Sequence, residues 1–414
     1  MTAPANEGAR TTDVVRNGAW LGGAQLIGWL TTPIVLLLIA RYLGAPALGS
    51  LGLAMAVWAV AGVAVDLGLE AEVVRRAAVA NEDVRALLRG AISPLTRSWL
   101  VAAPVVVGGQ HIIFGDSALT ALFAVVGIQA LIDRLAALFS AAARGLELMR
   151  EVSIADTVAK IATLAITIGL LVVTQAVWIV ASATLFAGLI RLALLAKTVR
   201  RNRSWRTGEL EATPKTPGLA RSAATLLAVN LAVVAYTQVD IIMMSILADA
   251  TAMGWYTAAE RFYTTSLFAA NVVLAAALPS MARLSSDDER AIDLTRRAFR
   301  VLLVAAMALG LGLWAVSDRA APLLFGTSFT EASGVLALFA LAIPATYVLI
   351  LLGGVAFATG RERVWLRIQV VGLLATIAGN WVLIPIADQE FGNAALGGAW
   401  TTLAIELALV PIAV

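Results

Sequence analysis

The sequence predicts an all-α integral membrane protein with about twelve transmembrane helices, and three observations predict this fold class. Hydrophobic residues make up 60% of the 414 residues and charged residues only 14%, whereas soluble domains are roughly 45–50% apolar and about 25% charged. Apolar runs of about 20 residues, long enough to cross a bilayer, recur along nearly the whole chain. Basic residues gather in alternate breaks between these runs, as they do in membrane proteins. The combination excludes a water-soluble domain.

The apolar runs are separated by short polar breaks, and each run defines one expected span. The expected spans are 18–40, 48–69, 90–110, 118–143, 154–174, 176–196, 222–247, 254–280, 298–316, 332–358, 364–386 and 394–413. The polar start of the chain and the first apolar run carry no cleavage-like site, so we expect the first span to remain in the mature protein. The absence of cysteine excludes disulfides and thiolate metal sites.

The basic residues test this map independently, because loops retained in the cytoplasm are rich in Lys and Arg. Of the 30 basic residues, 23 lie on one side of the map and only Arg41 and Arg319 lie on the other. The remaining five fall inside or at the edge of spans: Arg97, Arg134, Lys160, Arg191 and Arg261. We therefore expect a multi-pass protein of the cytoplasmic (inner) membrane with both termini in the cytoplasm.

The longest polar interval lies at the midpoint of the chain and predicts a division into two related halves. The expected parts are an N-terminal six-helix lobe (1–200), a cytoplasmic linker (201–221) and a C-terminal six-helix lobe (222–414). The segment 43–49, between the first two spans, resembles segment 247–254, about 205 residues later. Because six spans return the chain to its starting side, the expected repeat is parallel rather than inverted.

Several short motifs occur in an order and spacing that resemble those of one family. They are Ala40–Gly44 through Gly49, Asp66–Leu69 with Arg75 and Arg76, Asp240–Ile242, Gly254–Arg261, Leu278–Pro279, Leu324–Gly326 with Phe329, Leu383–Pro385 and Gly397–Ala399. On these motifs the sequence resembles the polysaccharide (oligosaccharide) flippase family of the multidrug/oligosaccharidyl-lipid/polysaccharide exporter superfamily. One departure is that the sequence ends at Val414 within an apolar run, where family members usually continue.

The resemblance implies a MATE-like arrangement, with two six-helix lobes around a central cavity that opens alternately to each side. It also implies a cargo, a polyprenyl diphosphate-linked oligosaccharide carried from the cytoplasmic to the outer leaflet for cell-surface glycan synthesis. Partners would then be the lipid-linked saccharide, membrane lipids, and glycosyltransferases or a polymerase. We expect no nucleic acid partner, and the two related halves remove any need for a dimer.

Ionisable residues inside spans form the list of candidate functional residues, because each costs about 2.5–3.5 kcal/mol to insert and usually faces a cavity or a partner. Arg261, with Glu260 beside it, is the first candidate for binding the diphosphate, since a guanidinium grips phosphate through two parallel hydrogen bonds. The alternative is an interfacial or internally paired arginine.

The doublet Asp133 and Arg134 lies in the fourth span, where adjacent residues point about 100° apart around the helix. Each is therefore expected to seek a partner on another helix. Arg134 is a candidate second phosphate contact, and the alternative is a structural pair between helices.

Asp240 follows three polar residues in the seventh span, which indicates a helix face turned away from lipid. It could couple transport to protons or help bind sodium, or it could form a structural clasp between helices. Glu406 and Lys160 are weaker candidates of the same kind. Asp66, at the cytoplasmic end of the second span, is expected to pair with Arg75 or Arg76 at a gate or interface.

Three function classes stay open from the sequence. A lipid-linked oligosaccharide flippase is favoured; an ion-coupled exporter of small organic cations has the same fold and would depend on intramembrane carboxylates. A membrane glycosyltransferase or polymerase needs a large extramembrane loop with catalytic carboxylates, and no expected loop is long enough. The sequence shows no nucleophile–base pair, nucleotide-binding loop or metal-ligand cluster, so we expect no enzyme, metal or cofactor beyond proton or sodium coupling.

Overall fold

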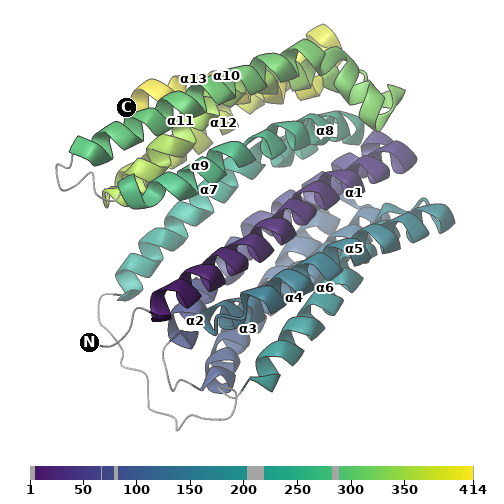
Figure 1. Ribbon diagram of the computed structural model, residues 1–414. Coiled ribbons are helices and arrows are strands. Elements are labelled where there is room, and N and C mark those ends of the chain that lie inside the picture. Colours follow the sequence, from purple (N-terminus) through teal and green to yellow (C-terminus); the bar gives the residue numbers. More distant parts are fainter. Residues whose placement is uncertain (1–4, 67, 79–82, 203–218, 282–288, 414) are drawn as a thin grey trace. The chain divides into compact units, whose positions relative to one another are not determined.

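The computed structural model describes residues 5–66, 68–78, 83–202, 219–281 and 289–413, and these residues are almost entirely helical (Figure 1). The helices are α1 (Ala5–Asp66), α2 (Leu69–Ala77), α3 (Val84–Phe114), α4 (Ser117–Gly145), α5 (Met149–Val173), α6 (Val177–Arg201), α7 (Leu219–Leu247), α8 (Ala250–Ser266), α9 (Phe268–Met281), α10 (Glu289–Phe325), the short 3₁₀ helix η3 (Thr327–Phe329), α11 (Ala332–Ala358), α12 (Glu362–Phe391) and α13 (Ala394–Ala413). Most of the expected linker, 201–221, lies outside the described residues.

Helix α1 carries the first two expected spans, joined at Gly44. The backbone of Gly44 has φ 82° and ψ 179°, a positive φ that glycine adopts at little cost. The expected loop between spans 18–40 and 48–69 is therefore reduced to a kink. Pro46 follows within one turn, at the start of the second helical segment, where proline is tolerated.

The expected span 254–280 is divided into two shorter helices, α8 of 17 residues and α9 of 14 residues, which meet at Leu267. Neither alone reaches the length of about 20 residues that a bilayer requires. Ten other helices are long and apolar enough to cross a membrane within the described residues. Since α1 carries two expected spans and α8 with α9 carries another, all twelve expected spans fall on helices.

Large apolar side chains point outward from these helices. Ile112 on α3 and Val172 on α5 are each 84% exposed, and Leu323 on α10 is 73% exposed. Apolar surface of this extent is unfavourable in water. The protein is therefore an all-α integral membrane protein.

The helices form two compact units, each described here by itself. Unit 1 contains residues 1–36 and 64–217. Within it α4 packs against α2, α3 and α6, and α5 packs against α6. Fully buried leucines hold this unit together, among them Leu88, Leu95, Leu138 and Leu195.

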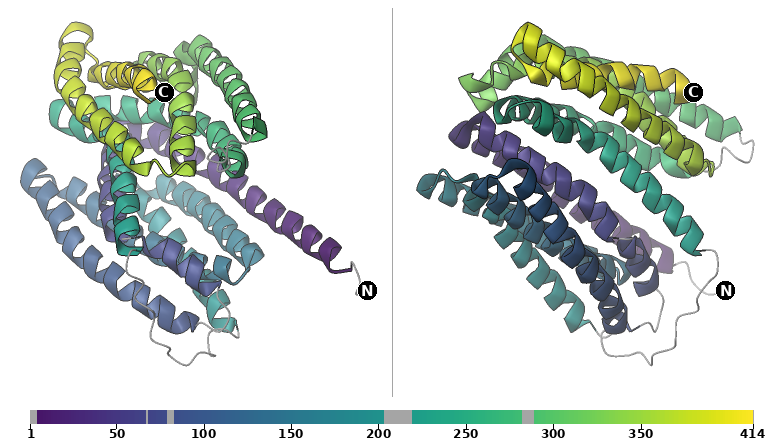
Figure 2. Two further views of the ribbon diagram at one scale, coloured as in Figure 1. Left: turned by 90° about the vertical axis from the view of Figure 1, so that its left-hand side faces the viewer. Right: turned by 180° about the vertical axis from the view of Figure 1, so that it is seen from behind.

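Unit 2 contains residues 37–63 and 218–414. Its most enclosed helix is α11, which α10, α13, α8 and α9 contact (Figure 1 and Figure 2). Phe339 of α11 lies 5.2 Å from the ring of Tyr256 and 5.0 Å from that of Tyr263, both on α8. Such aromatic pairs add about 0.5–1.5 kcal/mol beyond their buried area, so α8 is fixed firmly to α11.

The second segment of α1 belongs to unit 2 because it packs closely on α8. A Cβ atom built at Gly49 would lie 2.7 Å from the backbone nitrogen of Gly254, and one built at Gly254 would overlap the backbone of Ala45. Glycines that let two backbones approach in this way are common between membrane helices. The two copies of the expected repeat motif, 43–49 and 247–254, thus contact each other.

Candidate functional site

In unit 1 the polar side chains within the membrane connect α4, α5 and α6. Thr184 of α6 donates a hydrogen bond to the side-chain oxygen of Gln129 on α4 (2.6 Å), and the amide of Gln129 donates to Asp133 one turn later (3.3 Å). Buried polar groups need such partners because the surroundings supply no water. Asp133 is therefore held by its own helix.

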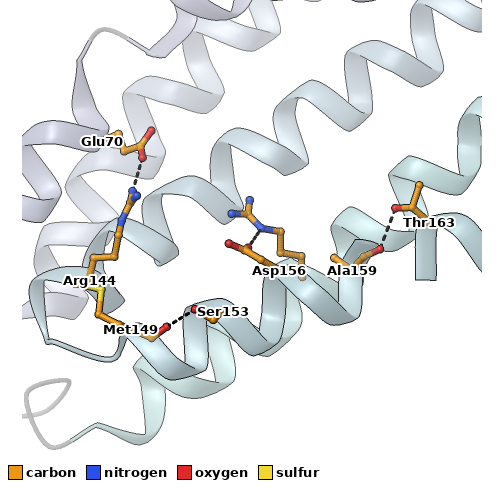
Figure 3. Close-up of polar contacts among 8 residues, drawn as sticks. Glu70, Arg144, Met149, Ser153, Asp156, Ala159 and Thr163 are labelled. Atoms are coloured by element: carbon orange, nitrogen blue, oxygen red, sulfur yellow. Dashed lines mark hydrogen bonds and ion pairs between the residues drawn. The ribbon is translucent and has the colours of Figure 1, made fainter. Parts of the chain in front are cut away.

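Three cations of unit 1 lie within electrostatic range of Asp133, namely Arg134, Lys160 and Arg191. The Arg191 guanidinium also binds Asp156 of α5 at 2.6 Å, a contact drawn beside Asp156 in Figure 3. The Lys160 ammonium donates to the hydroxyl of Thr32 on α1 at 3.3 Å. We call Arg134, Lys160 and Arg191 the unit 1 basic cluster.

Arg134 interacts electrostatically with Asp66 at the end of α1. Arg134 thus interacts with a residue of another helix, whereas the hydrogen bond of Asp133 comes from Gln129 on its own helix. Arg75, which the sequence associated with Asp66, forms an exposed ion pair with Glu72 on its own helix at 2.6 Å. Exposed pairs of this kind contribute about 0–1 kcal/mol.

A second contact at the same end of unit 1 joins α2 to α4. Arg144 donates to Glu70 across 2.5 Å, and both side chains are about one-third exposed (Figure 3). Arg144 directly follows the expected span 118–143, and the sequence indicated no partner for it. The separation of 74 residues explains why, since local patterns do not encode such a pair.

In unit 2 Arg261 occupies α8, and its guanidinium lies 4.0 Å from the carboxylate of Glu260. Its Nε atom is buried and has no hydrogen-bond partner in the described part of the chain. A buried donor left unpaired costs about 1–3 kcal/mol. Arg261 is therefore a cation with unused hydrogen-bonding capacity, which a bound anion could satisfy.

Asp240 of α7 lies in a buried polar site built from three further helices. Asn380 of α12 donates to one carboxylate oxygen at 2.6 Å, and Thr402 of α13 donates to the other at 3.4 Å. The side chain of Tyr256 on α8 also contacts this carboxyl group. Asp240 is 7% exposed and Asn380 fully buried, so this site is closed to bulk water.

The donor set around Asp240 suits a small hard cation. A carboxylate, an amide oxygen and a hydroxyl are all oxygen ligands, and the side-chain oxygen of Asn380 has no partner in the described residues. Sequence reasoning found Asp240 but missed Asn380 and Thr402. Asn380 is one of two amide side chains in the apolar run 364–386, with Gln369, and these amides were the available signal.

Glu406 is the second buried carboxyl group of unit 2, and it lies one turn beyond Thr402 on α13. The hydroxyl of Tyr236 on α7 donates to one of its oxygens at 3.0 Å. The other oxygen has no hydrogen-bond partner among the described residues. The structure thus places Glu406, a weaker candidate from sequence, in a position comparable to that of Asp240.

The profile of the polysaccharide biosynthesis protein family matches residues 14–285, about two-thirds of the chain. The chain belongs to this family. Among curated proteins, none matches the sequence.

Solved structures show the fold that this member of the polysaccharide biosynthesis protein family adopts. One is an inward-facing multidrug resistance MATE family transporter of the MOP superfamily (12% identity, 93% of each chain, TM-score 0.74). Another is the lipid II flippase MurJ in an inward closed conformation (13% identity, 95% of this chain and 87% of that chain, TM-score 0.72). A third is a mutant of the Vibrio cholerae MATE transporter VcmN (17% identity, 97% of each chain, TM-score 0.65). At these identities the likeness concerns the fold, and it confirms the predicted MATE-like membrane architecture.

Proposed function

We propose that the protein flips a polyprenyl diphosphate-linked oligosaccharide from the cytoplasmic to the outer leaflet by alternating access. The observation that carries the proposal is Arg261, a cation inside a membrane helix whose buried Nε has no partner among the described residues. A diphosphate supplies the anionic oxygens that a guanidinium binds bidentately. Membership of the polysaccharide biosynthesis protein family and the fold shared with a lipid II flippase support a cargo of this class.

The unit 1 basic cluster is a second set of cations that such a cargo would meet. Arg191 is already paired with Asp156, and Arg134 interacts with Asp66. The Lys160 ammonium donates to the hydroxyl of Thr32 and interacts electrostatically with Asp133. We therefore rank Arg261 above Arg134 as the phosphate contact.

The proposal includes an orientation and partners. Because basic loops favour the cytoplasmic side, we propose that both termini lie in the cytoplasm and that the chain spans the cytoplasmic membrane. Glycosyltransferases that make the lipid-linked saccharide, or a polymerase that uses it, are the partners we propose. The chain itself acts as a transporter, as a monomer and without catalytic residues.

A strain that lacks the protein tests the proposal in cells. We expect the lipid diphosphate-linked saccharide to accumulate on the cytoplasmic leaflet, and the wild-type chain supplied in trans to restore its appearance outside. Leaflet location is measured with a membrane-impermeant reagent that modifies the sugar. Ordinary appearance in the outer leaflet without the protein would refute the flippase function.

The second candidate function is an ion-coupled exporter of small organic cations. Two buried carboxyl groups, Asp240 and Glu406, favour it, since carboxylates attract cationic drugs and coupling ions alike. The fold is shared with a multidrug resistance MATE transporter. Export of organic cations that is driven by a proton or sodium gradient, together with normal saccharide flipping in the deletion strain, would support this candidate instead.

Ion coupling at Asp240 leads to a specific prediction. The Asp240→Asn variant keeps the size and much of the hydrogen bonding of the site but removes its negative charge, so it should lose the part of transport that a sodium or proton gradient stimulates. The measurement is the transport rate in vesicles with and without each gradient. Asp388→Asn, at the exposed end of α12, is the matched control and should retain that stimulation. Unchanged stimulation in Asp240→Asn would assign Asp240 a structural role.

A further inference from the structure

Two buried carboxyl groups lie one helical turn apart along the same pair of helices. Tyr236 and Asp240 are four residues apart on α7, and Thr402 and Glu406 are four residues apart on α13. Residues at this spacing share one face of a helix. The contact from Thr402 to Asp240 (3.4 Å) and that from Tyr236 to Glu406 (3.0 Å) therefore form two successive polar layers between α7 and α13.

The Glu406 layer differs from the Asp240 layer in its surroundings. Glu406 is 5% exposed, and one of its oxygens accepts from Tyr236 while the other has no partner in the described part of the chain. The hydroxyl of Thr346 on α11 lies within interaction range of this carboxyl group. Glu406 is thus enclosed by hydroxyl groups.

Among the described residues, the ionisable groups that interact with Glu406 carry no positive charge. They are Tyr236 and Asp240 of α7 and Tyr263 of α8. Helix α8 also carries Glu260 and Arg261, which pair with each other. Helix α11 contains no Asp, Glu, Lys, Arg or His. On α12 the charged residues lie in the first two and last two turns: Glu362, Arg363, Arg367, Asp388 and Glu390. An ionised carboxylate buried without a cation costs several kcal/mol.

The hydrogen bonds around Thr346 indicate which form of Glu406 fits the site. The hydroxyl of Thr346 lies 3.0 Å from the carbonyl oxygen of Ala342, to which it can donate, and 2.6 Å from the hydroxyl of Tyr263. When the Thr346 hydrogen points to Ala342, Tyr263 is the donor in the second contact. A hydroxyl oxygen has two lone pairs, and one remains free to accept a hydrogen bond. In this arrangement the neutral acid of Glu406 can donate to that lone pair, whereas an ionised carboxylate could accept from Thr346 only by taking its hydrogen away from Ala342.

We infer that Glu406 is a proton-binding site, a buried carboxylic acid that holds one proton between Tyr236 and Thr346. The site is distinct from the polar site at Asp240, because Glu406 is hydrogen-bonded to a hydroxyl group whereas Asp240 also accepts from the amide of Asn380. The proton site itself does not depend on the cargo. A role of this site in transport rests on the proposed function. In that role Glu406 releases or takes up a proton when Asp240 binds or releases an ion.

Infrared difference spectroscopy on the purified full chain tests this inference directly. The carbonyl stretching band of a protonated carboxylic acid should be present in the wild-type protein near neutral pH. It should be lost in Glu406→Gln, retained in Asp240→Asn, and shifted in frequency in Tyr236→Phe, which removes one hydrogen bond without removing the acid. The Tyr236→Phe shift keeps the test informative even if Glu406→Gln folds poorly.

Two results would overturn the inference. One is a protonated-acid band that persists unchanged in both Glu406→Gln and Tyr236→Phe. The other is loss of the wild-type band on adding sodium chloride but not choline chloride, which would make Glu406 a sodium ligand. No cargo is present in this experiment. The result of the spectroscopy therefore does not depend on whether the flippase proposal is correct.

Discussion

Replacing Arg261 by alanine is expected to lower the initial rate of saccharide flipping about 10- to 100-fold. Hydrogen bonds to charged groups contribute about 1.5–3 kcal/mol, and each 1.4 kcal/mol corresponds to a factor of about ten. Its buried Nε has no partner in the described residues, and its ion pair with Glu260 is long at 4.0 Å, so we expect its removal to cost little stability. The loss should therefore appear in transport and not in the melting temperature of the protein.

Two further variants sharpen this test. Arg261→Lys keeps the charge but not the planar fork of donors, and it should fall between wild type and alanine. Arg319→Ala removes an exposed arginine of α10 and should leave flipping unchanged. A full flipping rate in Arg261→Ala would contradict the phosphate role and favour the organic-cation exporter.

Replacing Gly397 by valine is expected to cost about 3 kcal/mol or more of unfolding free energy. A Cβ atom at this position would overlap the carbonyl of Leu383 and the Cα atom of Ile384 on α12. Overpacking usually costs about 1–3 kcal/mol when side chains can move, and a backbone cannot move aside as they do. The midpoint of thermal unfolding in detergent measures the effect.

Gly312→Val on α10 provides the control for this substitution. A Cβ atom there meets no atom within 4 Å, so the same change of residue should alter the melting temperature little. Equal losses for both variants would mean that helix propensity, and not the contact between α12 and α13, determines the result. The contact joins the motifs Leu383–Pro385 and Gly397–Ala399.

The helical membrane fold could be predicted from sequence because its signals are local. Apolar runs and the alternation of basic loops each follow from the bilayer itself. The kink at Gly44 and the break at Leu267 were harder to predict from the sequence. A kink within a long helix and a true loop have similar glycine-rich sequences. Leu267 follows Thr264, Thr265 and Ser266, and such a short polar stretch also occurs within continuous membrane helices.

The site was only partly predictable, for a physical reason. A charged residue inside an apolar run can be recognised from the sequence, as Asp240, Arg261 and Glu406 were. The partners of these residues are far away in the sequence. Asn380 lies 140 residues from Asp240, and Tyr236 lies 170 residues from Glu406. Such contacts depend on how whole helices pack, which periodicity within one helix does not specify.

Reconstitution of the purified chain tests the central claim most directly. Vesicles would contain a polyprenyl diphosphate-linked oligosaccharide, and a membrane-impermeant reagent would measure its movement between leaflets. The account predicts movement that depends on the protein, falls in Arg261→Ala and persists in Arg319→Ala. Movement no faster than in protein-free vesicles, with transport of an organic cation by the same preparation, would contradict it.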